Sequence, residues 1–311
     1  MDVFLHQFLL ALPLFSLILV GYLTMRVSGW PASVLDGLTR FAFNLAIPAM
    51  LFRLMGHSSD LPPVDWRLLI AFFGACLIVF ILGRLLSWKL FAFDGAAQSV
   101  FAMGGIFNNC VMLGLPLTKL ALGDAAVPSV ALIIVFNALI LWTLVSVSVE
   151  WARHGSFSPR GLARTAKGVL SNPIVASILG GTLFSLTGWT LPELIDSPIA
   201  MLGEAASPIA LIVLGMGLAE YGIRDGIRVS VTVSALKLIV QPLVVWGLAW
   251  LLGLPETETR AAVLLASMSI GANVYLMSCQ FKVLQGAMAG ALVLSTLLAS
   301  VTTPLVLALM H

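Results

Sequence analysis

Long apolar runs separated by short polar or Gly- and Pro-containing connections dominate the chain. A transmembrane helix needs about 20 mainly apolar residues, and on that measure the pattern predicts ten membrane-spanning helices. Their expected limits are 4–24, 33–55, 67–88, 95–119, 125–150, 168–188, 196–220, 229–252, 258–280 and 286–309. The expected fold class is therefore all-α and integral to a membrane.

The fourth apolar run is interrupted at its centre by the stretch GGIFNNCVMLGLP, residues 104–116. Asn108 and Asn109 are adjacent there, with glycines on both sides and Pro116 at the end. Irregular backbone and amide side chains at bilayer depth are tolerated only where they face protein or line a wet cavity. The stretch therefore predicts a binding site at a broken helix.

Composition supports the membrane class. Of the 311 residues, 60% are hydrophobic and 10% are charged, against about 25% charged in soluble domains. No linker separates two cores, so one integral domain is expected. The run 4–24 has no Lys or Arg in front of it and leads into a second run, which favours a true helix over a secretory signal.

Cysteine and histidine give no sign of a disulfide framework or a metal site. The cysteines are odd in number and lie in apolar runs, which favours packing roles. The four histidines lie outside the runs without ligand spacing, so no metal and no other cofactor is expected. The net charge of +2 gives no indication of a nucleic-acid partner. The cysteines are Cys76, Cys110 and Cys279, and the histidines are His6, His57, His154 and His311.

Basic residues in the connections predict the orientation. Ten basic residues lie in the connections that follow odd-numbered runs, and four lie on the opposite side of the membrane. The side with more basic residues is expected to be cytoplasmic. Both termini would then be external, in a multi-pass protein of the plasma membrane, expected to be the bacterial inner membrane. The first set is Arg26, Arg84, Lys89, Arg153, Arg160, Arg164, Lys167, Arg224, Arg228 and Lys282, and the second is Arg53, Arg67, Lys119 and Arg260.

The basic connection Trp151 to Lys167 divides the chain at its midpoint. Five runs on each side imply an inverted repeat, with halves 1–150 and 168–311 joined by the cytoplasmic loop 151–167. In run two Asn44 lies four residues before Pro48, and in run seven Glu204 lies four before Pro208. Run nine, with SMSIGANVY at 267–275, would match the break of run four.

Two broken helices have a specific chemistry. A helix interrupted inside the membrane exposes the N–H groups of its second half, and their partial positive charge suits a carboxylate or phosphate. Glycine permits the backbone shapes, proline lacks one N–H, and asparagine can cap a helix and donate to a ligand oxygen. The substrate-binding candidates are Asn108, Asn109, Gly114, Pro116, Ser269, Gly271, Asn273 and Tyr275.

A packing role is the alternative for these residues. Glycine in membrane helices often marks close contact, and an isolated asparagine such as Asn273 can simply bond a neighbouring helix. Gly286 and Gly290 are interpreted as packing only. Glu204 needs a partner or a proton inside a span, so it is either a structural hydrogen-bonding group or, with Asn44, a coupling site for H⁺ or Na⁺.

The stretches GGIFNNCVMLGLPL, NLAIPAMLF and SIGANVYLMS, with the 5+5 layout, resemble the auxin efflux carrier family, particularly its bacterial malonate-carrier-like branch. The resemblance covers essentially the whole chain. It implies a fold similar to bile acid symporters and sodium/proton antiporters, with a scaffold domain and a transport domain that holds crossing helices four and nine. It also implies that Asn109 and Pro116 occupy the crossing. A proline expected near Ser269 or Val274 is absent.

The expected function is a secondary transporter of a small mono- or dicarboxylate, malonate- or auxin-like, working by alternating access around that crossing. A ligand-sensing receptor without transport and a sodium-coupled, bile-acid-like symporter remain open. An intramembrane enzyme is not expected, because no His or Asp lies mid-run to act as a base. The lipid bilayer and the carboxylate are the expected partners, and a homodimer is left open.

Overall fold

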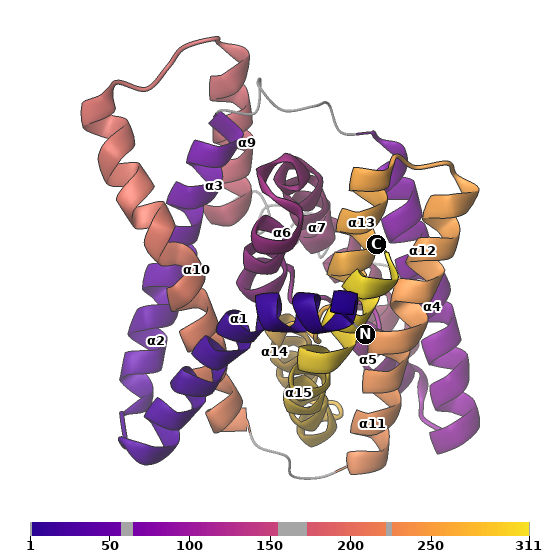
Figure 1. Cartoon of the computed structure of the whole chain (residues 1–311). Coiled ribbons are helices and arrows are strands. Elements are labelled where there is room, and N and C mark those ends of the chain that lie inside the picture. The colour runs from indigo at the N-terminus through magenta and orange to yellow at the C-terminus, as the bar shows by residue number, and fades with distance from the viewer. Residues whose placement is uncertain (1, 57–64, 155–172, 222–225, 311) are drawn as a thin grey trace.

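The computed structural model describes residues 2–56, 65–154, 173–221 and 226–310, which are almost entirely helical (Figure 1). The all-α prediction is confirmed. The α-helices are α1 (Asp2–Val27), α2 (Ala32–Phe41), α3 (Ile47–Gly56), α4 (Arg67–Phe91), α5 (Gly95–Gly104), α6 (Leu115–Leu122), α7 (Val127–His154), α9 (Pro173–Leu186), α10 (Glu193–Tyr221), α11 (Ile227–Ala235), α12 (Gln241–Leu251), α13 (Glu256–Ala266), α14 (Ala272–Phe281) and α15 (Gln285–Leu309). Shorter turns are η1 (Ala42–Ala46), η3 (Cys110–Gly114), η4 (Asp124–Ala126) and η5 (Leu236–Val240).

Several helical stretches of the described residues have the length and apolar composition to cross a membrane. Four more stretches are apolar but shorter, and the predicted connection 151–167 lies outside the described residues from position 155 onward. The protein is therefore a multi-pass membrane protein. The long stretches are Ala32–Arg53, Arg67–Phe91, Glu193–Ala219, Ile227–Leu251 and Gln285–Leu309, and the shorter ones are Ala11–Val27, Cys110–Leu122, Asp124–Asn137 and Pro173–Leu186.

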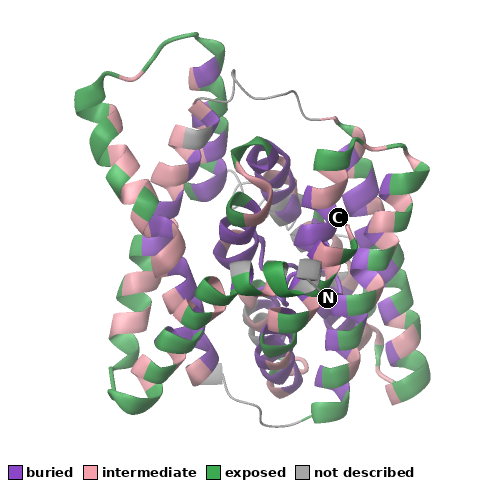
Figure 2. Ribbon diagram, in the orientation of Figure 1, coloured by how far each residue is buried: buried purple, intermediate pink, exposed green. Residues whose placement is uncertain are grey.

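The outer helices are apolar on their exposed faces as well as on their buried ones. On α4, Leu77 and Ile81 are about half exposed, whereas Phe72 and Cys76 are fully buried. Figure 2 shows the buried residues concentrated on the central helices and the exposed ones on the outer helices and the helix ends. A helix that is apolar all round is suited to a lipid environment on one side and protein on the other.

The helices form two groups (Figure 1). In the first, α1 packs along α10, and α3 contacts both α9 and α10. In the second, α4 contacts α5 and α12, α5 contacts α7, and α11 contacts α15. The groups meet where α1 contacts α15 and α6, and where α10 contacts η3. The α1–α2 connection lies at one end of the molecule, and the α9–α10 and α12–α13 connections lie at the opposite end (Figure 1).

The π-helical turns η1, η3 and η5 share a position relative to proline. Each ends two residues before a proline, namely Pro48, Pro116 and Pro242. A proline inside a helix lacks an N–H, and its ring collides with the carbonyl one turn earlier. Widening the preceding turn relieves that collision, and such π turns occur often at functional sites.

Candidate functional site

The predicted break in run four is present. Helix α5 ends at Gly104, residues 107–109 are not helical, and η3 starts the second half at Cys110. With 10 residues, α5 is about 15 Å long, about half of a bilayer's hydrocarbon thickness. The break therefore lies near the middle of the span.

A second break lies in run nine, where α13 ends at Ala266 and α14 begins at Ala272. It forms without a proline because α15 supplies hydrogen-bond partners to the freed backbone. The Ile270 N–H donates to Ser295 Oγ at 3.1 Å, and Thr303 Oγ1 donates to the Ser267 carbonyl at 3.0 Å. Non-helical backbone at membrane depth requires such partners.

The two breaks are paired with each other. The Asn109 N–H donates to the Ser269 carbonyl at 2.9 Å, the Gly271 N–H donates to the Phe107 carbonyl at 3.1 Å, and Asn108 and Ile270 form an antiparallel bridge. A Cβ at Gly271 would lie 2.9 Å from the Asn108 carbonyl oxygen. Glycine is therefore needed at position 271 for the close approach of the two chains.

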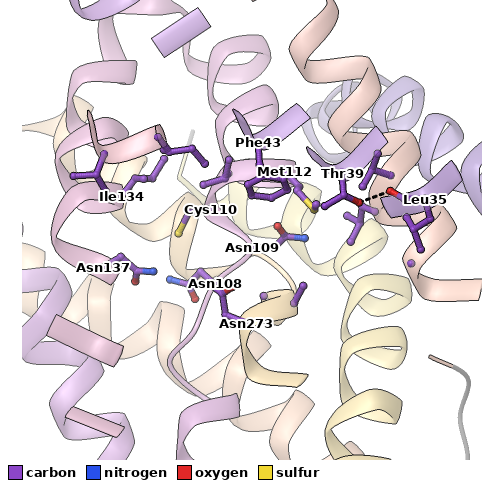
Figure 3. Close-up of a pocket in the computed structure, with 18 of the residues that line it drawn as sticks. Leu35, Thr39, Phe43, Asn108, Asn109, Cys110, Met112, Ile134, Asn137 and Asn273 are labelled. Carbon is purple, nitrogen blue, oxygen red and sulfur yellow. Dashed lines mark hydrogen bonds between the residues drawn. The ribbon is translucent and has the colours of Figure 1, made fainter. Parts of the chain in front are cut away.

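A cavity of about 480 Å³ opens beside the paired breaks, within the range of about 300–1,000 Å³ typical of small-molecule sites. Figure 3 shows its labelled side chains. The residues that line it are Leu35, Asp36, Thr39, Phe43, Asn108, Asn109, Cys110, Val111, Met112, Ile134, Asn137, Ile174, Val175, Val213, Leu214, Gly217, Gly271, Ala272 and Asn273.

Amide groups converge on this cavity without hydrogen-bond partners among the described residues. Both side-chain polar atoms of Asn108, the Asn109 Nδ2 and the Asn137 Oδ1 are buried and unpartnered. The Asn108 and Asn137 side chains point toward one another, whereas Asn109 points away from them (Figure 3). Buried amides normally have partners, so these unpaired ones indicate groups that a ligand would satisfy.

The second half of each broken helix begins at the cavity wall. Cys110, Val111 and Met112 open η3, and Ala272 and Asn273 open α14. The first N–H groups of a helix have no intrahelical acceptor and carry partial positive charge. The cavity thus combines amide donors with two helix N-termini, and such a set can bind a carboxylate.

The other predicted residues lie around this site. Gly114 and Pro116 are buried in η3 and α6, and Ser269 is buried and joins the pairing through its carbonyl. Tyr275 lies on α14 outside the cavity lining. Whether these residues bind substrate stays a prediction.

Glu204 and Asn44 also lie outside the cavity lining, and both side chains are exposed. The Arg53 guanidinium of α3 donates to both carboxylate oxygens of Asp196 on α10 at 2.8 and 2.9 Å, and Glu204 on α10 adds a smaller favourable electrostatic contribution to Arg53. Glu204 is therefore near the Arg53–Asp196 ion pair, in the group formed by α1, α3, α9 and α10.

Sequence reasoning missed three polar residues of the cavity. Asn137 is a single amide in the apolar run 125–150, and that isolation was a usable signal. Asp36 and Thr39 on α2 line the cavity from the opposite group of helices. No sequence pattern connects them to the breaks, because their placement depends on how α2 packs against distant parts of the chain.

These features define a multi-pass membrane protein with a ligand-sized cavity between interrupted helices. The family model described as membrane transport protein matches residues 7–158 and 161–307, and the chain belongs to this family, which includes the auxin efflux carriers. The resemblance inferred from sequence is confirmed. It is a family of membrane transporters, not of enzymes.

Three relatives cover nearly the whole chain. A protein described as a malonate transporter of Rhizobium meliloti (strain 1021) is 29% identical over 94% of this chain and 92% of its own length. Auxin efflux carrier component 8 of Arabidopsis thaliana is 19% identical over 96% of this chain and 95% of its own length. An uncharacterized transporter of Methanothermobacter thermautotrophicus is 24% identical over 93% of both chains.

Proposed function

We propose that this protein is a secondary transporter of a small organic anion that carries one or two carboxylates. The observation that carries the proposal is the cavity at the paired helix breaks, where Asn108, Asn109 and Asn137 bury unpartnered amide atoms. Amide N–H groups and helix N-termini are donors that a carboxylate can accept from. Two relatives are named for malonate and for auxin, both of which are carboxylates.

Alternating access around the paired breaks is the mechanism that fits this arrangement. In it the helices α1, α2, α3, α9 and α10 act as a scaffold, and the remaining helices carry the site across the membrane. Residues lining the cavity come from both groups, with Asp36 and Thr39 on one side and Asn108 and Asn137 on the other. Relative motion of the groups would therefore open and close the cavity.

The proposed architecture is that of ten spans in two inverted five-helix repeats, 1–150 and 168–311, joined by a cytoplasmic loop. The paired breaks support it, because each lies in the fourth predicted span of its half. Both termini would be external in a bacterial inner membrane. Coupling to H⁺ or Na⁺ through Glu204 or Asn44, and assembly as a homodimer, belong to the same proposal.

Ligand binding is tested first. Purified protein is screened by thermal shift against acetate, malonate, succinate, phenylacetate and indole-3-acetate. We expect at least one carboxylate to raise the melting temperature and Asn109→Ala to reduce that shift. Thr232→Ala is the matched control, because Thr232 lies outside the cavity lining and its hydroxyl donates to the Arg228 carbonyl of its own helix. No stabilisation by any carboxylate would reject the proposal.

Transport is tested by counterflow of the labelled carboxylate in proteoliposomes. A transporter accumulates label against an unlabelled internal pool, whereas a receptor binds the ligand without moving it. Binding without counterflow would therefore favour the receptor. Counterflow that is lost in Asn109→Ala and kept in Thr232→Ala would support transport through the cavity.

A further inference from the structure

A fully buried lysine lies in the middle of an apolar span. Lys237 belongs to η5, at the centre of the stretch Ile227–Leu251, and its side chain has no exposure. A charged side chain inside a membrane span is costly and usually has a function. Sequence reasoning missed it, although a single basic residue in run 229–252 was a visible signal. Lys237 takes part in none of the ion pairs that the described residues show, such as Arg53–Asp196 and Arg67–Asp65.

Lys237 instead binds the carbonyl end of a broken helix. Its Nζ donates at 2.6 Å to the carbonyl of Ala266, the last residue of α13. One turn later, Gln241 Nε2 donates at 3.2 Å to the carbonyl of Ile106, two residues beyond the end of α5. The C-terminal ends of both first halves therefore meet one face of η5 and α12. Those ends carry partial negative charge, which favours a cation.

The cavity lies on the other side of the paired breaks. Cys110 lines it, whereas Lys237 and Gln241 do not. The lysine thus meets the paired breaks from behind, through the Ala266 carbonyl, without lining the cavity. Among the described residues that do line the cavity, Asp36 carries the one acidic side chain, and no Lys, Arg or His is present.

We propose that Lys237 is the charge-compensating residue of the site: its ammonium group balances one carboxylate held by the amides and helix N-termini across the paired breaks. The inference rests on the proposed function and narrows its substrate class. Lys237 balances the carboxylate held at the paired breaks, whereas a second carboxylate would have no such partner and would be repelled by Asp36, which lines the cavity from the opposite group of helices. The preferred substrate is therefore a monoanion, and Lys237 acts as a positioning residue that does not touch it.

The first test uses the unsubstituted full-length protein. Affinities are measured for acetate, phenylacetate and indole-3-acetate against their primary amides, and for malonate, malonamate and malonamide, which carry two, one and no negative charges. We expect each monocarboxylate to bind roughly tenfold or more tightly than its amide, and malonamate to bind more tightly than malonate. Equal binding of acids and amides, or preference for the malonate dianion, would overturn the inference.

The second test removes the charge. Lys237→Met should weaken carboxylate binding by roughly tenfold and leave binding of the matching amide nearly unchanged, whereas Lys237→Arg should keep the preference for acids. Gln241→Leu is the control, because it removes a contact to the paired breaks and retains the charge; it should affect acid and amide alike. Equal loss for acid and amide in Lys237→Met would assign the lysine a structural role alone.

The outcomes separate the two proposals. If the unsubstituted protein binds no carboxylate, the proposed function fails and this inference with it. If it binds carboxylates and Lys237→Met binds them equally well, only the inference fails. Should Lys237→Met not fold, Lys237→Gln takes its place in the comparison of acids with amides.

Discussion

Gly215 on α10 lies directly against the carbonyl oxygen of Ile18 on α1, and a Cβ at Gly215 would come within 1.9 Å of that oxygen. The relationship is reciprocal, because a Cβ at Gly21 on α1 would lie 2.0 Å from the Ile212 carbonyl oxygen of α10. Small residues let membrane helices approach backbone to backbone. The two glycines therefore determine how closely α1 and α10 pack.

Replacing Gly215 with Ala should destabilise the protein. Overpacking costs about 1–3 kcal/mol and sometimes more, and here the clash is with backbone that cannot rotate away. We expect a clear fall in the melting temperature of the purified protein. Gly247→Ala is the control, because nothing lies within 4 Å of a Cβ there, and alanine is the better helix former. Equal melting temperatures for both variants would show that α1 and α10 are not held by this contact.

Removing amides at the paired breaks should weaken substrate binding. Asn109 is buried with an unpartnered Nδ2, so Asn109→Ala should cost about 1–3 kcal/mol, or roughly tenfold to hundredfold in affinity. Asn273 is exposed within the cavity lining, so water can replace its donor. The loss of affinity in Asn273→Ala should therefore be at the low end of that range. Titration of the best carboxylate measures both. Unchanged affinity in both variants, with normal melting temperatures, would indicate that the asparagines have a packing role and do not bind substrate.

The pairing of the breaks can be tested through Gly271. A Cβ there would lie 2.9 Å from the Asn108 carbonyl oxygen, so Gly271→Ala should push the two chains apart and weaken substrate binding by roughly tenfold or more. Gly74→Ala is the control, because its Cβ would meet only the Leu248 side chain, at 3.5 Å. Binding is measured with the same carboxylate. Full affinity in Gly271→Ala would mean that the site does not depend on the close pairing.

The sequence could reveal those parts of the site whose residue types are unusual for an apolar membrane span. Residues 104–116 combine glycine, asparagine and proline in an apolar run, and this pattern predicted the first break. The second break has no proline, and Ser295 and Thr303 supply its partners from another helix. Asp36 reaches the cavity only through tertiary packing, so no local pattern marked it. Lys237 was visible in the sequence, but its partner is the carbonyl end of α13, which only the structure identifies.

Topology is tested by cysteine labelling of a functional, Cys-free version. The asymmetry of basic residues predicts that the connection Trp151 to Lys167 is cytoplasmic and both termini are external. Single cysteines at the termini should react with a membrane-impermeant reagent added outside intact cells, and a cysteine at Ser158 should react only after permeabilisation. Labelling of the connection but not of the termini in intact cells would reverse the orientation.

The last prediction concerns coupling through Glu204. Because Glu204 is outside the cavity lining, Glu204→Gln should keep the affinity for substrate. The coupling proposal predicts that uptake by this variant no longer depends on pH between about 5 and 8, or on sodium. The reason is that a neutral amide neither releases a proton nor carries the charge that attracts a cation. The alternative is that Glu204 supports Arg53, which it attracts beside the Arg53–Asp196 ion pair. Asp196→Asn separates the two roles, because it weakens that ion pair without changing Glu204, and it should lower the melting temperature while keeping any pH and sodium dependence. Uptake by Glu204→Gln that retains the pH and sodium dependence of the parent would eliminate the coupling role and leave Glu204 as an electrostatic partner between α3 and α10.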